Sequence, residues 1–231
     1  MPILRVLPFS LLLLSVVPHA VRADKPPPFS SPKIIDRPIR FDAERVRLTV
    51  EYRRVHQDAA ASDASMTPRM IVLHFTGGTS LQSAWTYFDR LHAEPSRKRL
   101  VRAGAVNVSA HFLVDQDGTI YRLLPETTMA RHVIGLNHVA IGVENVGNGK
   151  STPLTEAQVL ANAALVRYLA TRYSITHLIG HHEADRMRSH PDYKENDPAY
   201  RNDHSDPGNQ FMARVRAQLS DLVLAGPPAT P

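Results

Sequence analysis

The chain has 231 residues, 43% of them hydrophobic, and a formal net charge of +5 at neutral pH. This length and composition suit one compact domain with its own core. There is no cysteine, which excludes disulfides, thiolate metal ligands, cysteine nucleophiles and lipid attachment at cysteine. No run of Lys and Arg is interleaved with aromatic residues, so we expect no nucleic-acid partner.

The first 23 residues have the pattern of a secretory signal peptide. Arg5 precedes an apolar run from Leu7 to Val17, and Val21-Arg22-Ala23 has the character of a cleavage site. The run is short for a membrane span, and no second stretch of spanning length follows it. We therefore expect cleavage near Ala23, a periplasmic or secreted location and no stable membrane insertion of the mature chain. The alternative is an uncleaved membrane anchor.

Proline-rich stretches border the expected domain. Residues 24–40, which include Pro26-Pro27-Pro28, are expected to form an extended linker, and residues 225–231 a flexible tail. The folded domain is therefore expected over residues 41–224. Without residues 1–23 the chain carries a charge of +3, which suits approach to an anionic polymer such as a cell-wall polysaccharide.

Strand and helix signals alternate along this domain. Apolar and polar residues alternate from Val46 to Tyr52, which predicts a half-exposed edge strand, and the apolar run 70–73 predicts a buried strand ending at His74. Further strands are expected at 106–114, 119–124, 139–143 and 175–179, and helices at about 80–91, from 155 onward and at 209–224.

Two local signals support this assignment. The Asp117-Gly118 pair lies between two of the expected strands and predicts a hairpin. Thr155 and Gln158 have the spacing of a capping box at a helix N-terminus. We therefore predict an α/β fold, a single domain with a central mixed β-sheet flanked by helices.

Two of the twelve histidines stand out by position. His74 ends the most apolar strand, just before Gly77-Gly78, and His181 follows Gly180 at the end of another short strand. Strand ends of this kind face a shared cleft. Two neutral imidazoles and one more ligand, with a position left open for water, are what catalytic zinc requires. Without cysteine, the third ligand must be Asp, Glu or His.

Asp206 is the favoured third ligand because Pro207-Gly208 forms a rigid turn after it. The other acidic or imidazole candidates in the same stretch are Asp185, His190, Asp197 and Asp203. Among the remaining histidines, His111 is expected to be structural or next to the site. Surface, boundary or loop positions are expected for His56, His92, His138, His177 and His182.

Five segments then occur in a recognisable order. They are VLHFTGG at 72–78, SAHFLVDQDGTIY at 109–121, AIGVE at 140–144, IGH at 179–181 and DPG at 206–208. Together they resemble the zinc-dependent N-acetylmuramoyl-L-alanine amidases related to peptidoglycan recognition proteins. The resemblance covers about residues 68 to 215, nearly the whole expected domain.

The resemblance implies a set of roles. The ligands of the Zn²⁺ ion would be His74, His181 and Asp206. Glu144 would act as general base and proton shuttle, and His132 and Asn137 would lie along the substrate cleft. The implied reaction is hydrolysis of the amide between N-acetylmuramic acid and L-alanine in peptidoglycan or muropeptides.

The sequence departs from the family pattern at two places. His204 stands where the family often has an oxyanion-stabilising lysine, two residues before the aspartate ligand, so we expect His204 to assist catalysis with its own pH dependence. The stretch from His181 to Asp206 is also long and polar, and it is either a wall of the cleft or a solvated loop.

Two other functions remain open at this point. One is a non-catalytic peptidoglycan-binding module of the same fold. The other is zinc-dependent hydrolysis of a different bond, such as a peptide bond of the stem, although the chain has no His-Glu-x-x-His motif.

Overall fold

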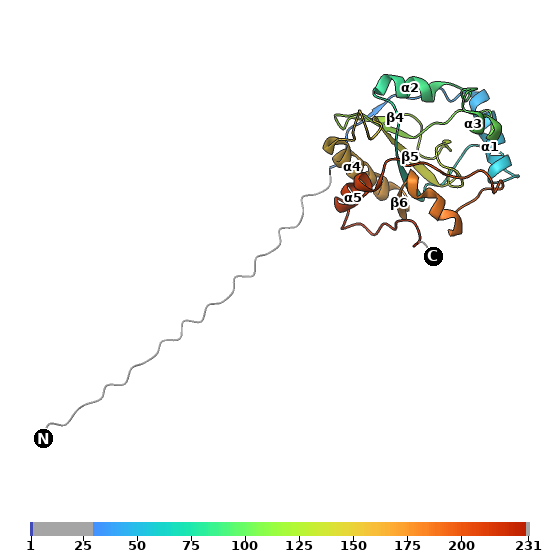
Figure 1. The fold of residues 1–231 in the computed structure, drawn as a ribbon. Helices are drawn as coiled ribbons and strands as arrows, with labels where there is room; N and C mark the ends of the chain where they lie inside the picture. The colour runs from blue at the N-terminus through green and yellow to red at the C-terminus, as the bar shows by residue number, and fades with distance from the viewer. Residues whose placement is uncertain (2–29, 230–231) are drawn as a thin grey trace. The chain divides into compact units, whose positions relative to one another are not determined.

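The computed structural model describes Met1 and residues 30–229 (Figure 1). Residues 2–29 and 230–231, and with them the expected signal peptide, lie outside the described part. The chain divides into Met1–Ser30 and Ser31–Pro231, and the helices and strands belong to the second unit. Between residues 30 and 229, no helix has the length and hydrophobicity needed to cross a bilayer.

A mixed six-stranded sheet forms the centre of this unit, in the order β1-β4-β3-β5-β2-β6. The strands are β1 (Ile34–Asp36), β2 (Met70–Phe75), β3 (Phe112–Val114), β4 (Ile120–Arg122), β5 (Ala140–Asn145) and β6 (His177–Gly180). Among these six strands of the described part, only β3 and β4 pair in antiparallel fashion, which confirms the expected hairpin. The predicted fold class is therefore confirmed.

The helices pack around this sheet (Figure 1). They are α1 (Ala43–His56), α2 (Leu81–Asp89), α3 (Lys98–Ala103), α4 (Glu156–Arg172), the 3₁₀ helix η1 (His181–Ser189) and α5 (Asn209–Ala217). The capping box at Thr155 is present as predicted. Ser80 caps α2.

The two faces of β2 and β5 have different surroundings because side chains alternate along a strand. Ile71, Leu73, Ile141 and Val143 share a core cluster with α4 and α5. Met70 and Val72 belong to a second cluster, with Ile179 and Ala184 among its members. His74 has the same parity as Met70 and Val72, so its side chain points away from α4 and α5.

The expected edge strand at residues 46–52 is wrong, because this segment lies within α1. Asp42 caps that helix by accepting a hydrogen bond from the Arg45 backbone N–H. The buried face includes Arg45, Thr49, Tyr52 and His56, which is helical spacing. Because much of this face is polar, the apolar residues alone matched a strand period by coincidence.

The boundaries of the folded part also differ from those expected. Ile34–Asp36, assigned to the linker, pair with β4, and Ile39 is buried. Ala225, assigned to the tail, forms a bridge with His177. The sheet therefore begins before residue 41, and ordered contacts continue past residue 224.

Candidate metal centre

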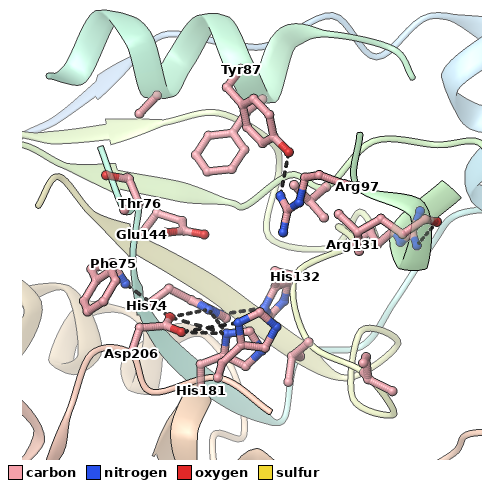
Figure 2. Close-up of a pocket in the computed structure, with 18 of the residues that line it drawn as sticks. His74, Phe75, Thr76, Tyr87, Arg97, Arg131, His132, Glu144, His181 and Asp206 are labelled. Carbon is pink, nitrogen blue, oxygen red and sulfur yellow. Dashed lines mark hydrogen bonds and ion pairs between the residues drawn. The ribbon is translucent and has the colours of Figure 1, made fainter. Parts of the chain in front are cut away.

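Three side chains from separate segments converge at one edge of the sheet (Figure 2). His74 lies near the end of β2, His181 directly follows β6, and Asp206 lies in the loop before α5. The Nδ1 atoms of the two histidines are 3.0 Å apart. Carboxylate oxygens of Asp206 lie 3.2 Å from Nδ1 of His181 and 3.4 Å from Nδ1 of His74. All three residues are buried.

Backbone contacts hold Asp206 in this position. Its carbonyl oxygen accepts a 2.8 Å hydrogen bond from the His182 N–H, and its carboxylate accepts one of 3.3 Å from the Phe75 N–H. The aspartate loop is thereby attached both to η1 and to the end of β2.

The donor set fits a zinc ion. Two imidazole nitrogens and a carboxylate oxygen are typical ligands of catalytic zinc, and three protein ligands leave a position open. Within residues 30–229, this is the only group of three or more His, Asp or Glu side chains with converging ligand atoms. The alternative third ligands Asp185, His190, Asp197 and Asp203 are not part of it.

The protonation states also suit a divalent cation. Burial and the neighbouring His181 lower the pKa of His74 to about 4. Burial alone would raise the pKa of Asp206, but hydrogen bonds and charges from His181 and His74 hold it well below its usual range. At neutral pH the site therefore contains a neutral His74 imidazole and an ionised Asp206 carboxylate, as metal binding requires.

Glu144 lies beside this cluster. In the parallel pairing of β2 with β5 it is the partner of His74, and its side chain lies close to the ligands in Figure 2. It is 9% exposed, and its Oε2 has no hydrogen-bond partner among the described residues. Burial and the nearby Asp206 raise its pKa well above the usual range, although Arg97 acts in the opposite direction. Such a carboxyl group is suited to take up and release a proton.

With this geometry established, comparison with known proteins gives a consistent result. The sequence family described as N-acetylmuramoyl-L-alanine amidase, Amidase_2, matches residues 64–209. The chain belongs to this amidase family. Mouse peptidoglycan recognition protein 3 is 30% identical over 89 residues, which is 36% of this chain but only 25% of the mouse protein.

Solved structures show the same fold. The endolysin amidase LysCS from Clostridium intestinale is 24% identical, with a TM-score of 0.54, and the match covers 83% of this chain and 98% of that one. LysC from the same organism is also 24% identical, with a TM-score of 0.52, and covers 82% of this chain and 99% of that one.

His132 and Asn137 line the cleft that opens over the metal-ligand cluster, and their polar groups have hydrogen-bond partners within the protein. The side-chain oxygen of Asn137 accepts two 2.8 Å hydrogen bonds, from the backbone N–H groups of His132 and Val133. The ring nitrogens of His132 lie 3.0 Å from Nε2 of His74 and 3.0 Å from the Ala140 carbonyl oxygen. Both residues thus line the cleft and are held by contacts within the protein, and their expected contacts with substrate stay a prediction.

His204 stacks on His181, one of the three candidate metal ligands. The ring centroids are 4.0 Å apart and the planes differ by 19°. Burial and the neighbouring His181 lower the pKa of His204 to about 4. At neutral pH the ring is therefore neutral, and it can act as an N–H donor but not as a cation.

A cleft of about 770 Å³ opens over the cluster. Figure 2 shows Tyr87 and Arg97 on the side opposite the ligands, where the Arg97 guanidinium donates a 2.6 Å hydrogen bond to the Tyr87 hydroxyl. Arg99 forms an ion pair with Asp203, which joins α3 to the segment after η1. The sequence signal for this basic side of the cleft is the Arg97-Lys98-Arg99 run.

The long segment between His181 and Asp206 is a wall of the cleft. Tyr200, Asp203 and His204 line it, and buried contacts attach it to the domain. Glu195 pairs with His56 at 2.7 Å, and both side chains are 3% exposed. His56 was expected at the surface or a boundary, and it is buried instead because this segment covers it.

Proposed function

We propose that the protein is a zinc-dependent amidase that hydrolyses the bond between N-acetylmuramic acid and L-alanine in peptidoglycan or muropeptides. The observation that carries this proposal is the convergence of His74, His181 and Asp206 beside a buried Glu144, whose Oε2 has no hydrogen-bond partner among the described residues. Membership of the amidase family supports the choice of bond.

The residues divide the work as follows. His74, His181 and Asp206 would hold the zinc ion, which when bound lowers the pKa of water and polarises a carbonyl. Glu144 accepts a proton from the attacking water as the water oxygen bonds to the amide carbon. It then gives the proton to the amine nitrogen as the carbon–nitrogen bond breaks. An N–H group of His204 is near enough to the ligands to stabilise the developing oxyanion.

The cleft walls fit an extended, partly anionic substrate. The Arg97 guanidinium faces the side of the cleft that carries Glu144. A glycopeptide with free carboxylates would meet a cation there and apolar surface elsewhere. We therefore propose peptidoglycan or its soluble muropeptide fragments as the partner.

Incubation of the purified protein with muropeptides tests this function. We expect release of stem peptides with a free L-alanine N-terminus, loss of that release with a chelator, and recovery with zinc; mass spectrometry identifies the products. Binding without release and without bound metal would favour a non-catalytic peptidoglycan-binding module. Cleavage within the stem would favour hydrolysis of a different bond.

The proposed location of the protein depends on residues outside the described part. We propose that residues 1–23 direct export and are removed near Ala23, so that the enzyme acts in the periplasm or outside the cell. N-terminal sequencing of protein recovered from those fractions tests this. An N-terminus at Met1 in a membrane fraction would contradict it.

A further inference from the structure

His132 lies behind the metal-ligand cluster and contacts one ligand directly. Its Nδ1 is 3.0 Å from Nε2 of His74, on the side of that ring remote from His181. Its own Nε2 is 3.0 Å from the Ala140 carbonyl oxygen. Figure 2 shows the two rings in contact, and they meet edge to face with centroids 5.1 Å apart.

These contacts determine where the protons lie. A carbonyl oxygen only accepts, so Nε2 of His132 must carry a proton to bond to Ala140. In the neutral ring, Nδ1 of His132 is then an acceptor, and it accepts from the N–H at Nε2 of His74. Nδ1 of His74 is left with its lone pair, and this atom faces His181 and Asp206.

We propose that His132 is a positioning residue that fixes both the ring orientation and the proton distribution of His74, so that Nδ1 of His74 is presented to the metal. This inference rests on the proposed zinc site. A histidine ligand commonly donates its other N–H to a carbonyl or carboxylate, and loss of that partner weakens metal binding. Here the partner is a second histidine, itself held by the backbone of β5.

The surroundings of His132 leave its ring little freedom. It is 8% exposed. A Cβ atom at Gly142 would come within 2.7 Å of Cγ of His132, so the glycine of the Ile-Gly-Val-Glu segment is what lets the ring lie against β5. The backbone of His132 is held by the side chain of Asn137. Gly142 therefore leaves room for the His132 ring, and Asn137 holds the His132 backbone.

Variants of His132 test the proposal through metal affinity. His132→Phe removes the acceptor, and we expect zinc to bind about 10- to 100-fold more weakly, measured by competition with a chromophoric chelator. His132→Asn places a side-chain oxygen near the position of Nδ1, and we expect affinity within a few-fold of wild type. The absorption spectrum of the Co²⁺-loaded protein should change in the Phe variant and be largely restored in the Asn variant.

His111 provides the matched control. Its ring is fully buried and bonds to two backbone groups, as that of His132 does to one, and none of its hydrogen bonds among the described residues involves His74. It meets the His132 ring edge to face with centroids 5.9 Å apart, a contact that a Phe ring can keep. His111→Phe should lower the thermal midpoint without lowering zinc affinity. A folded His132→Phe protein with wild-type zinc affinity would overturn the proposal, and so would equal losses of affinity in both Phe variants.

A measurement on the wild-type protein avoids dependence on variant folding. Nitrogen-15 NMR of the metal-free protein should show the proton on Nε2 in both His74 and His132. A proton on Nδ1 of His74 would refute the assignment. If the wild-type protein bound no zinc, the proposed function would fail, while this spectrum would still decide whether His132 sets the proton position of His74.

Discussion

Replacing Glu144 by Gln should separate activity from stability. Gln keeps the shape of the side chain but cannot take up the water proton, so we expect kcat to fall about 10²- to 10⁴-fold. The buried Oε2 has no partner in the described structure, and an unpartnered buried polar group destabilises a fold by about 1–3 kcal/mol, a charged one by more. If about 1 kcal/mol is recovered, the metal-free protein should unfold roughly 2–4 °C higher.

The pH dependence of this gain follows from the sign of the pKa shift. The pKa of Glu144 is raised in the folded protein above its ordinary value of 4.5 by burial and by Asp206. Folding therefore favours the protonated form, and wild-type stability declines as pH rises above about 4.5. The advantage of Glu144→Gln should be absent below that pH and should grow towards neutrality.

Glu183 provides a control of opposite sign. It is similarly buried, but it bonds to Arg216 at 2.6 and 2.9 Å and to the Gly180 N–H at 2.8 Å. Burial alone would raise its pKa, but Arg216 and Gly180 lower it. Glu183→Gln should therefore lower the unfolding temperature at neutral pH. Calorimetry of the metal-free proteins and product release from muropeptides provide the data. A Glu144→Gln protein that was less stable, or that kept wild-type turnover, would refute this reasoning.

Three further outcomes follow from the same structure. His204→Ala should reduce turnover about 10²- to 10³-fold. The reduction should be the same at every pH from 5 to 8, because the ring is neutral throughout; unchanged turnover would exclude a role for His204 in catalysis. Burial lowers the pKa of His111 from 6.5 to about 4, although the hydrogen bond to the Thr128 carbonyl acts oppositely. Because the unfolded chain takes up this proton first, the folded state should lose about 3 kcal/mol of stability as pH falls from 6.5 to 4. His111→Asn should flatten this acid decline in chemical unfolding, and a wild-type-like decline would count against it. Gly142→Ala should weaken zinc binding by displacing His132, and unchanged affinity would show that the ring has room to move.

The parts of the site that the sequence predicted are those with local signals. His74 and His181 each end or follow a short apolar strand, and strands β2 and β6 pair in parallel, so their ends meet at one edge. Glu144 is the residue before the last in the neighbouring strand β5, and the same rule brings it beside His74. The hairpin and the capping box were also local signals, since each depends on residues a few positions apart.

The sequence favoured Asp206 as the third ligand but left Asp185, His190, Asp197 and Asp203 open, and it did not choose between a cleft wall and a solvated loop for the long segment before Asp206. That choice depends on contacts between residues far apart in the chain, such as His56 with Glu195. Helix α1 was misassigned for a related reason. Its buried face carries Arg45, Thr49 and His56, and polar residues are recognised as buried only when their partners are known.

Local apolar pattern thus predicted strands β2 to β6, the hairpin, and the strand ends that carry His74, His181 and Glu144. Tertiary packing decided that Asp206, and none of its four rivals, converges with His74 and His181, that the long segment is a cleft wall, and that His132 bonds to His74. The physical reason is that burial of apolar strands is encoded in short periodic runs, whereas the partners of buried polar groups are set by which segments the fold brings together.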